Sequence, residues 1–127
     1  RKDFPGGWDG DPVNKFVAAG RTEQENAAFN HIKALAGFRK KSSALTTGKL
    51  MQFLPKDGLY SYFRYDNKQT IMVIMNTGTA TLKPDWNYLS EKTNGFSKLR
   101  DVINNQTFTK DAFEIKPKES FVFELLK

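Results

Sequence analysis

The residue types best suited to chemistry lie at the start of the chain, in the segment RKDFPGGWDGD of residues 1–11. Phe4 and Trp8 are flat aromatic side chains, and Pro5 with the neighbouring glycines keeps their backbone out of regular structure. Sugars are bound by aromatic rings against their C–H faces and by charged groups on their hydroxyls, and Asp3 stands next to Phe4. The loop therefore holds both kinds of group that a saccharide needs, although packing of the loop against the protein explains the same residues.

Metal-binding and nucleophilic chemistry has little support in the rest of the sequence. The 127 residues contain no cysteine and one histidine, His31, which excludes thiol nucleophiles, disulfides and histidine-rich metal sites and leaves the cellular compartment open. Asp3, Asp9 and Asp11 lack the closing glutamate of a calcium-binding EF-hand loop, and no glycine-rich phosphate-binding pattern occurs. We therefore expect neither a metal nor a cofactor.

The charge and the apolar runs bound the possible partners. A formal net charge of +6 permits an anionic polymer, but the densest basic cluster, Arg39-Lys40-Lys41, falls where a helix is expected to end and complements the helix dipole. Tyr60, Tyr62 and Phe63 suit packing across strands better than a nucleic-acid stacking platform. No apolar run approaches the ~20 residues that cross a bilayer. We expect neither nucleic acid nor a membrane as a partner.

A long helix is expected over residues 23–41. Thr22 and Glu25 have the spacing of a capping box, in which each satisfies the other's backbone N–H. Behind them runs a stripe at helical spacing that comprises Ala28, Phe29, Ile32, Leu35, Ala36 and Arg39. Burying one large apolar side chain stabilises by roughly 1.5–3 kcal/mol, against ~1 kcal/mol for the cap. Whatever covers the stripe therefore decides whether the helix forms.

From Gly48 onward the hydrophobic pattern changes from the helical to the strand period. The run QTIMVIMN, residues 69–76, is apolar on both faces and is expected to be an interior strand. Turn residues separate it from further short strands, which are expected at 48–53, 59–65, 79–83, 99–103, 106–109, 113–116 and 120–126. About eight strands with no helices between them predict a mainly β fold, an antiparallel Greek-key β-sandwich preceded by a loop and one long N-terminal α-helix.

The order of these parts resembles the C-terminal part of α-amylase superfamily glycoside hydrolases, specifically the neopullulanase and cyclomaltodextrinase group. The segment RKDFPGGW resembles a loop that follows the last strand of their catalytic (β/α)8 barrel. The segment GRTEQENAAFNHIKALAGFRKKSSAL, residues 20–45, resembles the closing helix of that barrel. The strands that contain YSYFR and IMVIMN resemble the start of their C-terminal β-sandwich, so the resemblance covers essentially the whole chain.

On this resemblance, residues 1–43 are the loop and last helix of a truncated barrel, and residues 44–127 are a C-terminal β-sandwich domain. The chain is then a non-catalytic segment of an enzyme that hydrolyses α-glucosidic bonds in starch-derived oligosaccharides, pullulan or cyclodextrins, because the family's catalytic carboxylates precede Arg1. A chain that begins with Arg1 and not with Met also suits a fragment.

The resemblance also implies the partners and the site. The partners are the upstream catalytic barrel of the same chain, which the sandwich would stabilise, and an α-glucan oligosaccharide in the intact enzyme. Asp3, Phe4 and Trp8 are expected to contact this substrate, because the loop they occupy lies on the catalytic face of such barrels. The alternative is a self-sufficient carbohydrate-binding module for α-glucans, in which Trp8, Trp86 and Tyr88 present aromatic rings.

Overall fold

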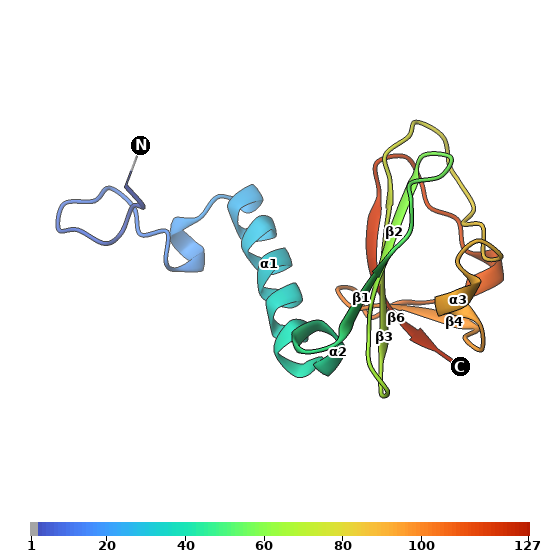
Figure 1. The fold of residues 1–127 in the computed structure, drawn as a ribbon. Helices are drawn as coiled ribbons and strands as arrows, with labels where there is room; N and C mark the ends of the chain where they lie inside the picture. The colour runs from blue at the N-terminus through green and yellow to red at the C-terminus, as the bar shows by residue number, and fades with distance from the viewer. Residues whose placement is uncertain (1–2) are drawn as a thin grey trace. The chain divides into compact units, whose positions relative to one another are not determined.

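The computed structural model describes residues 3–127, which form two compact units, one ending at Ala36 and the other comprising Gly37–Lys127. Arg1 and Lys2, the first two residues of the predicted loop motif, lie outside the described residues. The first unit contains a loop, the short 3-10 helix η1 (Ala18–Gly20) and most of helix α1 (Glu23–Lys41), which continues across the boundary (Figure 1).

Helix α1 begins and ends where the sequence predicts. Its capping box is formed, since the backbone N–H of Glu25 donates to Thr22 Oγ1 at 3.2 Å and the N–H of Thr22 donates to Glu25 Oε2 at 2.7 Å. No residue of α1 is buried, however, and Phe29 and Ile32 of the predicted stripe are 44% and 66% exposed. Local capping therefore organises the start of this helix, and the part of its apolar stripe that contains Phe29 and Ile32 stays open to solvent.

The second unit contains one antiparallel sheet of six strands, in the order β1-β2-β3-β6-β4-β5 (Figure 1). Strand β3 is the predicted interior strand, and it pairs with β2 on one side and β6 on the other. Three short helical segments, α2 (Ser43–Thr46), α3 (Ser90–Thr93) and η2 (Lys110–Ala112), accompany the sheet. The strands are β1 (Lys49–Gln52), β2 (Leu59–Tyr65), β3 (Thr70–Asn76), β4 (Lys98–Asp101), β5 (Thr107–Thr109) and β6 (Ser120–Leu126).

The described residues thus hold six strands in one sheet in place of the expected eight-stranded Greek-key sandwich. Residues 79–83 and 113–116 do not join the sheet, because their backbones pair with each other at a single bridge between Leu82 and Ile115. Leu82 donates to the carbonyl of Ile115 at 3.0 Å and Ile115 donates back at 2.9 Å. Both segments instead bring side chains to the hydrophobic core, where Ile115 is buried and Leu82 packs.

The core lies on the inner face of the sheet. Register places Phe63 of β2 opposite Met72 of β3, and Met72 opposite Phe123 of β6, so three fully buried side chains form one row. Residues of the covering segments complete the cluster from outside the sheet and include Leu89, Phe113 and Ile115. Phe113 meets Phe123 edge-on at 5.0 Å between ring centroids, a favourable aromatic arrangement.

The outer face of the sheet is covered at one end by α2, which packs on β2 and β3. Ser42 Oγ donates to Gln69 Oε1 at 2.5 Å, and Gln69 Nε2 donates to Glu124 Oε1 at 2.7 Å. Arg64 Nε adds a hydrogen bond of 3.3 Å to the carbonyl of Ala44, which is itself fully buried. These contacts hold the turn that follows α1 firmly against the sheet.

Asn76, at the end of β3, is expected to be the most sensitive polar residue of the second unit. Its Nδ2 donates to the carbonyls of Ala80 and Ile115 at 2.8 and 3.1 Å, and its Oδ1 accepts from Gly78 at 2.9 Å, with 2% of the residue exposed. Asn76→Ala removes these bonds and should lower the free energy of unfolding in urea by about 2–3 kcal/mol. The exposed Asn87→Ala is the matched control and should change it by less than about 0.5 kcal/mol. Equal urea midpoints for the two variants would contradict this assignment.

Candidate functional site

The loop that carries the predicted site residues is shaped by Asp11. Its Oδ2 accepts from the backbone N–H groups of Gly6 at 2.7 Å and Trp8 at 3.0 Å, which lowers the pKa of the Asp11 carboxyl below its usual value. Gly6 has φ +108°, and a Cβ there would lie 2.5 Å from the side-chain oxygen of Asn14. Only glycine suits this turn, because other residues rarely adopt positive φ and would also clash.

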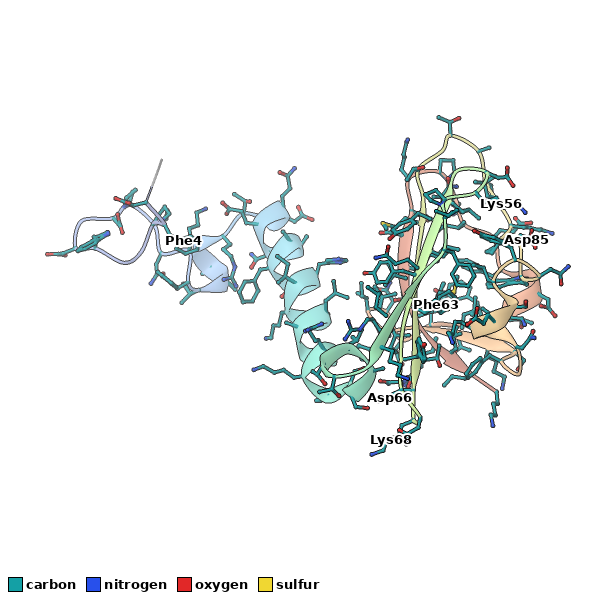
Figure 2. The ribbon with its side chains drawn as sticks, viewed as in Figure 1. Phe4, Lys56, Phe63, Asp66, Lys68 and Asp85 are labelled. Carbon is teal, nitrogen blue, oxygen red and sulfur yellow. The ribbon has the colours of Figure 1, made fainter. Side chains whose placement is uncertain are left out.

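The structure does not bring the three predicted site residues together. Asp3 is exposed, and Trp8 is 73% exposed and has no aromatic neighbour among the described residues. Phe4, labelled in Figure 2, is 59% exposed and meets Phe16 edge-on at 4.9 Å. Phe16 was not singled out from the sequence, where nothing sets it apart from ten other phenylalanines.

Phe4 and Phe16 border a hollow of about 470 Å³ within the first unit. This volume falls in the range of about 300–1,000 Å³ that ligand pockets occupy. Its walls are mainly apolar, and it is lined by Phe4, Pro5, Lys15, Phe16, Arg21, Glu25, Ala28 and Phe29. The hollow therefore combines aromatic rings with charged groups, although Phe4 is the one predicted site residue that lines it.

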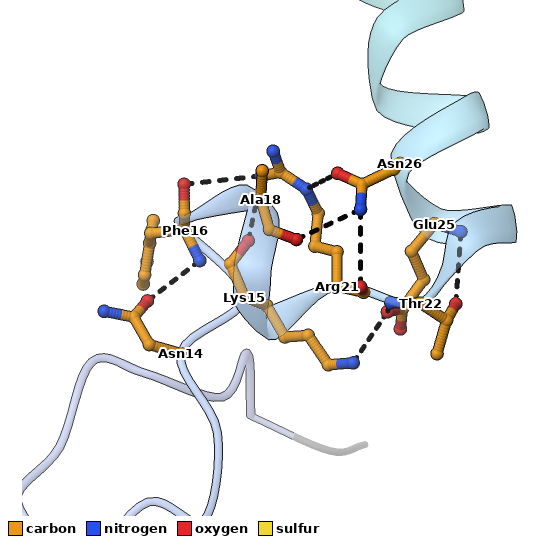
Figure 3. Close-up of polar contacts among 8 residues, drawn as sticks. All are labelled: Asn14, Lys15, Phe16, Ala18, Arg21, Thr22, Glu25 and Asn26. Carbon is orange, nitrogen blue, oxygen red and sulfur yellow. Dashed lines mark hydrogen bonds and ion pairs between the residues drawn. The ribbon is translucent and has the colours of Figure 1, made fainter.

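Arg21 organises the polar side of this hollow (Figure 3). Its Nε donates to Asn26 Oδ1 at 2.9 Å, and its Nη1 donates to the carbonyls of Lys15 and Phe16 at 3.0 and 3.3 Å. Its Cζ atom also lies 3.9 Å from the ring centroid of Phe29, a cation–π contact. Sequence reasoning missed Arg21, for which the one available signal was its position directly before the capping box.

Lys15 and Glu25 form an ion pair at 2.6 Å beside the same network (Figure 3). The hydrogen bond from Lys15, helped by the N–H of Thr22, holds the pKa of the Glu25 carboxyl below its usual value. Glu25 thus joins two roles, since it closes the capping box and anchors the loop to α1. The sequence predicted the first of these roles only.

The remaining candidates lie apart from this hollow. His31 is exposed on α1. Trp86 is half-buried and packs against the core, whereas Tyr88 is 37% exposed. Within residues 3–127, no group of three or more His, Cys, Asp or Glu side chains has an arrangement that could hold a metal ion. None of the described helices is both long and apolar enough to span a membrane.

The family of the chain follows from comparison with known proteins. The model of the cyclo-malto-dextrinase C-terminal domain matches residues 50–124, which is more than half of the chain and includes all of β2, β3, β4 and β5. The chain belongs to this family. The matched residues lie within the second unit, and the predicted resemblance to the C-terminal part of α-amylase superfamily enzymes is confirmed.

Several solved structures share the fold of this member of the cyclo-malto-dextrinase C-terminal domain family. AmyP in complex with maltose is 17% identical, with a TM-score of 0.66 over 92% of this chain and 22% of that one. Trehalose-6-phosphate hydrolase from Bacillus licheniformis is 23% identical, with a TM-score of 0.61 over 93% and 22%. A MutB mutant in complex with sucrose is 20% identical, with a TM-score of 0.54 over 73% and 17%. The chain spans about a fifth of the length of these structures.

Glu25 is expected to titrate below an ordinary glutamate because of Lys15. Its pKa is lowered in the folded chain, so its stabilising contribution is present above the unfolded pKa of about 4.3 and is lost as pH falls through the lower folded value. Lys15→Met should raise the midpoint of the Glu25 carboxyl in a ¹³C NMR titration. Lys33→Met, which removes an exposed lysine from α1, the helix that contains Glu25, should leave the Glu25 midpoint unchanged. An unchanged midpoint in Lys15→Met would show that the ion pair of Lys15 and Glu25 does not stabilise the ionised Glu25 carboxyl.

Proposed function

We propose that the chain is the non-catalytic C-terminal segment of a glycoside hydrolase that acts on α-glucosidic bonds of starch-derived oligosaccharides, pullulan or cyclodextrins. The observation that carries this proposal is the match of residues 50–124 to the cyclo-malto-dextrinase C-terminal domain. The fold neighbours support it, since one of them is AmyP in complex with maltose and another is a trehalose-6-phosphate hydrolase.

Residues 1–43 would supply the loop and last helix of the catalytic barrel, and residues 44–127 the C-terminal β-domain. The exposed stripe of α1 supports this division, because a 19-residue helix with no buried side chain lacks the tertiary packing that stabilises most helices. In the intact enzyme the barrel would cover Phe29 and Ile32.

The β-domain would pack on the barrel and stabilise it. The outer face of the sheet supports such a contact, since Leu50 is 50% exposed and five further side chains on this face are mainly apolar and half-buried. They are Tyr60, Tyr62, Val73, Met75 and Val122.

Asp3, Phe4 and Trp8 would contact the α-glucan in the intact enzyme. The exposure of Trp8 supports this role, because it leaves aromatic surface open to a sugar ring. The chemistry itself would belong to the barrel. Retaining enzymes of this kind use two carboxyl groups about 5–5.5 Å apart, whereas Asp11 in the loop and Glu25 at the hollow are engaged in the structural roles described above.

The first test is that the chain alone has no hydrolytic activity. Purified chain should release no reducing sugar from maltoheptaose, pullulan or β-cyclodextrin above a blank without protein, because it would lack the catalytic carboxylates. The gene product that includes the barrel, assayed in parallel by the same reducing-sugar method, should be active. Cleavage by the chain alone, or a gene that encodes no barrel, would overturn the proposal.

A second test uses one substitution in two contexts. In the chain alone, Ile32→Ala should change the free energy of unfolding by less than about 0.5 kcal/mol, because Ile32 is 66% exposed. In the gene product that includes the barrel, the same change should destabilise by about 2 kcal/mol or more in urea, because a covered isoleucine is truncated. Lys33→Ala should be nearly neutral in both contexts. An equally small effect of Ile32→Ala in both would count against burial by the barrel.

The alternative function is a self-sufficient carbohydrate-binding module for α-glucans. The exposure of Tyr88 favours it, whereas the half-buried Trp86 is less suited to stack on a sugar than the sequence suggested. The two functions are distinguished by whether the gene also encodes a catalytic barrel. The hydrolase segment requires one, whereas a self-sufficient module needs no barrel in the same polypeptide.

A further inference from the structure

A small hollow lies in the second unit between the turn that joins β1 to β2 and the segment of residues 83–89. We call it the Ser61 hollow. It encloses about 40 Å³, which is room for a hydroxymethyl group or a few waters and too little for a whole sugar ring. Its apolar lining residues are Phe53, Leu54, Leu59, Pro84 and Leu89. Its polar lining residues are Lys56, Asp57, Ser61, Lys83, Asp85 and Tyr88.

The turn on one side of the Ser61 hollow is rigid. Asp57 and Gly58 have φ of +52° and +85°, as the two central residues of a type I′ hairpin turn require. Lys56 and Leu59 on either side exchange both backbone hydrogen bonds, at 3.0 and 2.9 Å. The position of the Lys56 backbone is therefore set by the hairpin.

Asp85 and Tyr88 link the other side of the hollow to this turn. Asp85 Oδ1 accepts from the N–H of Tyr88 at 3.0 Å, and its Oδ2 accepts from Lys56 Nζ at 2.7 Å (Figure 2). The Tyr88 hydroxyl donates to the carbonyl of Leu54 at 3.2 Å, and Lys56 Nζ lies 5.2 Å from the Tyr88 ring centroid. The rim is thus preorganised by its own contacts, so a ligand would not have to order it.

Ser61 provides an unused polar group in the hollow. It is 5% exposed, and none of the side-chain hydrogen bonds found within residues 3–127 involves its hydroxyl. It lies on the inner face of β2, in the same lining as Leu59 and Leu89. Because Ser61 lines the hollow, its hydroxyl can form a hydrogen bond with a ligand or a water that enters from the open side.

The rim specifies the chemical class of that ligand. It carries two lysines, Lys56 and Lys83, and two aspartates, Asp57 and Asp85, so its formal charge is zero. Apolar surface lies between them, because Leu54 is 81% exposed and Tyr88 37%. A balanced set of donors and acceptors beside an aromatic and an aliphatic side chain suits a neutral ligand with hydroxyls and a C–H face, and disfavours an anion or a cation.

We propose that the Ser61 hollow is an accessory saccharide-binding site, in which the hydroxymethyl group of a glucose residue of an α-glucan hydrogen-bonds to Ser61 and its ring lies over Leu54 and Tyr88. The charged side chains of the rim would bind the ring hydroxyls. The choice of an α-glucan rests on the proposed function. The site itself does not, since its geometry and charge derive from the second unit alone.

The test is an NMR titration of the ¹⁵N-labelled chain with maltotriose. We expect progressive shifts of the backbone amides of Lys56, Ser61 and Tyr88, with a dissociation constant of about 1–10 mM, as suits a shallow site for one sugar residue. Xylotriose, whose sugar rings lack the hydroxymethyl group, should shift these amides at least several-fold less. No shift at these amides with maltotriose, or equal shifts with xylotriose, would overturn the inference.

Variants separate the site from general effects on the fold. Tyr88→Ala should weaken binding at least fivefold, and Ser61→Ala at least threefold while the amide spectrum stays dispersed. Tyr62→Ala removes a tyrosine from the opposite face of the sheet and should leave the affinity within twofold of the parent chain. Unchanged affinity in Ser61→Ala would overturn the role of the hollow, even if Tyr88→Ala failed to fold.

The outcome is independent of the hydrolase test. If the gene product that includes the barrel cleaves α-glucans but maltotriose leaves the amides of the Ser61 hollow unmoved, the inference fails and the proposed function stands. If maltotriose binds in the hollow but the gene encodes no barrel, the proposed function fails and the saccharide site remains.

Discussion

The second unit depends on the row of inner-face side chains that β3 places between its two neighbours. Phe63, Met72 and Phe123 are each fully buried and come from three adjacent strands. Because a shift of one residue in register would turn such a row to the opposite face, the hydrophobic core and the strand pairing specify each other. The covering segments contribute Phe113 and Ile115 to the same cluster, so they have a surface to pack on only once this row has formed.

Sequence patterns predicted the elements whose causes are local. The capping box of α1 and the alternation in β2 and β6 involve neighbours along the chain, and the structure contains all three. Residues 79–83 and 113–116 show the same alternation, yet they form no sheet strands. Their backbone groups are used by a single bridge at Ile115 and by the side chain of Asn76, which is a contact between distant positions that no local pattern reports.

The sequence indicated which types of residue the predicted site contains, but it did not indicate which residues lie beside them in the folded chain. Phe4 was recognisable as an aromatic side chain in a flexible segment, but its neighbour Phe16 and the hydrogen bonds of Arg21 depend on how the loop folds back onto α1. Ser61 was not singled out from the sequence. Its place in a hollow could not have been, because this depends on where the segment of residues 83–89 packs.

The position of β6 governs the order in which the domain can be completed during synthesis. This strand, Ser120–Leu126, is the last in sequence but lies inside the sheet between β3 and β4. Until it has left the ribosome, β1-β2-β3 and β4-β5 are separate hairpin-like pieces with unpaired edges, and unpaired edges invite association with other chains. A nascent polypeptide would therefore carry an unfinished sheet until Ser120–Leu126 has emerged, and a premature stop before Ser120 would leave two halves with no strand to join them.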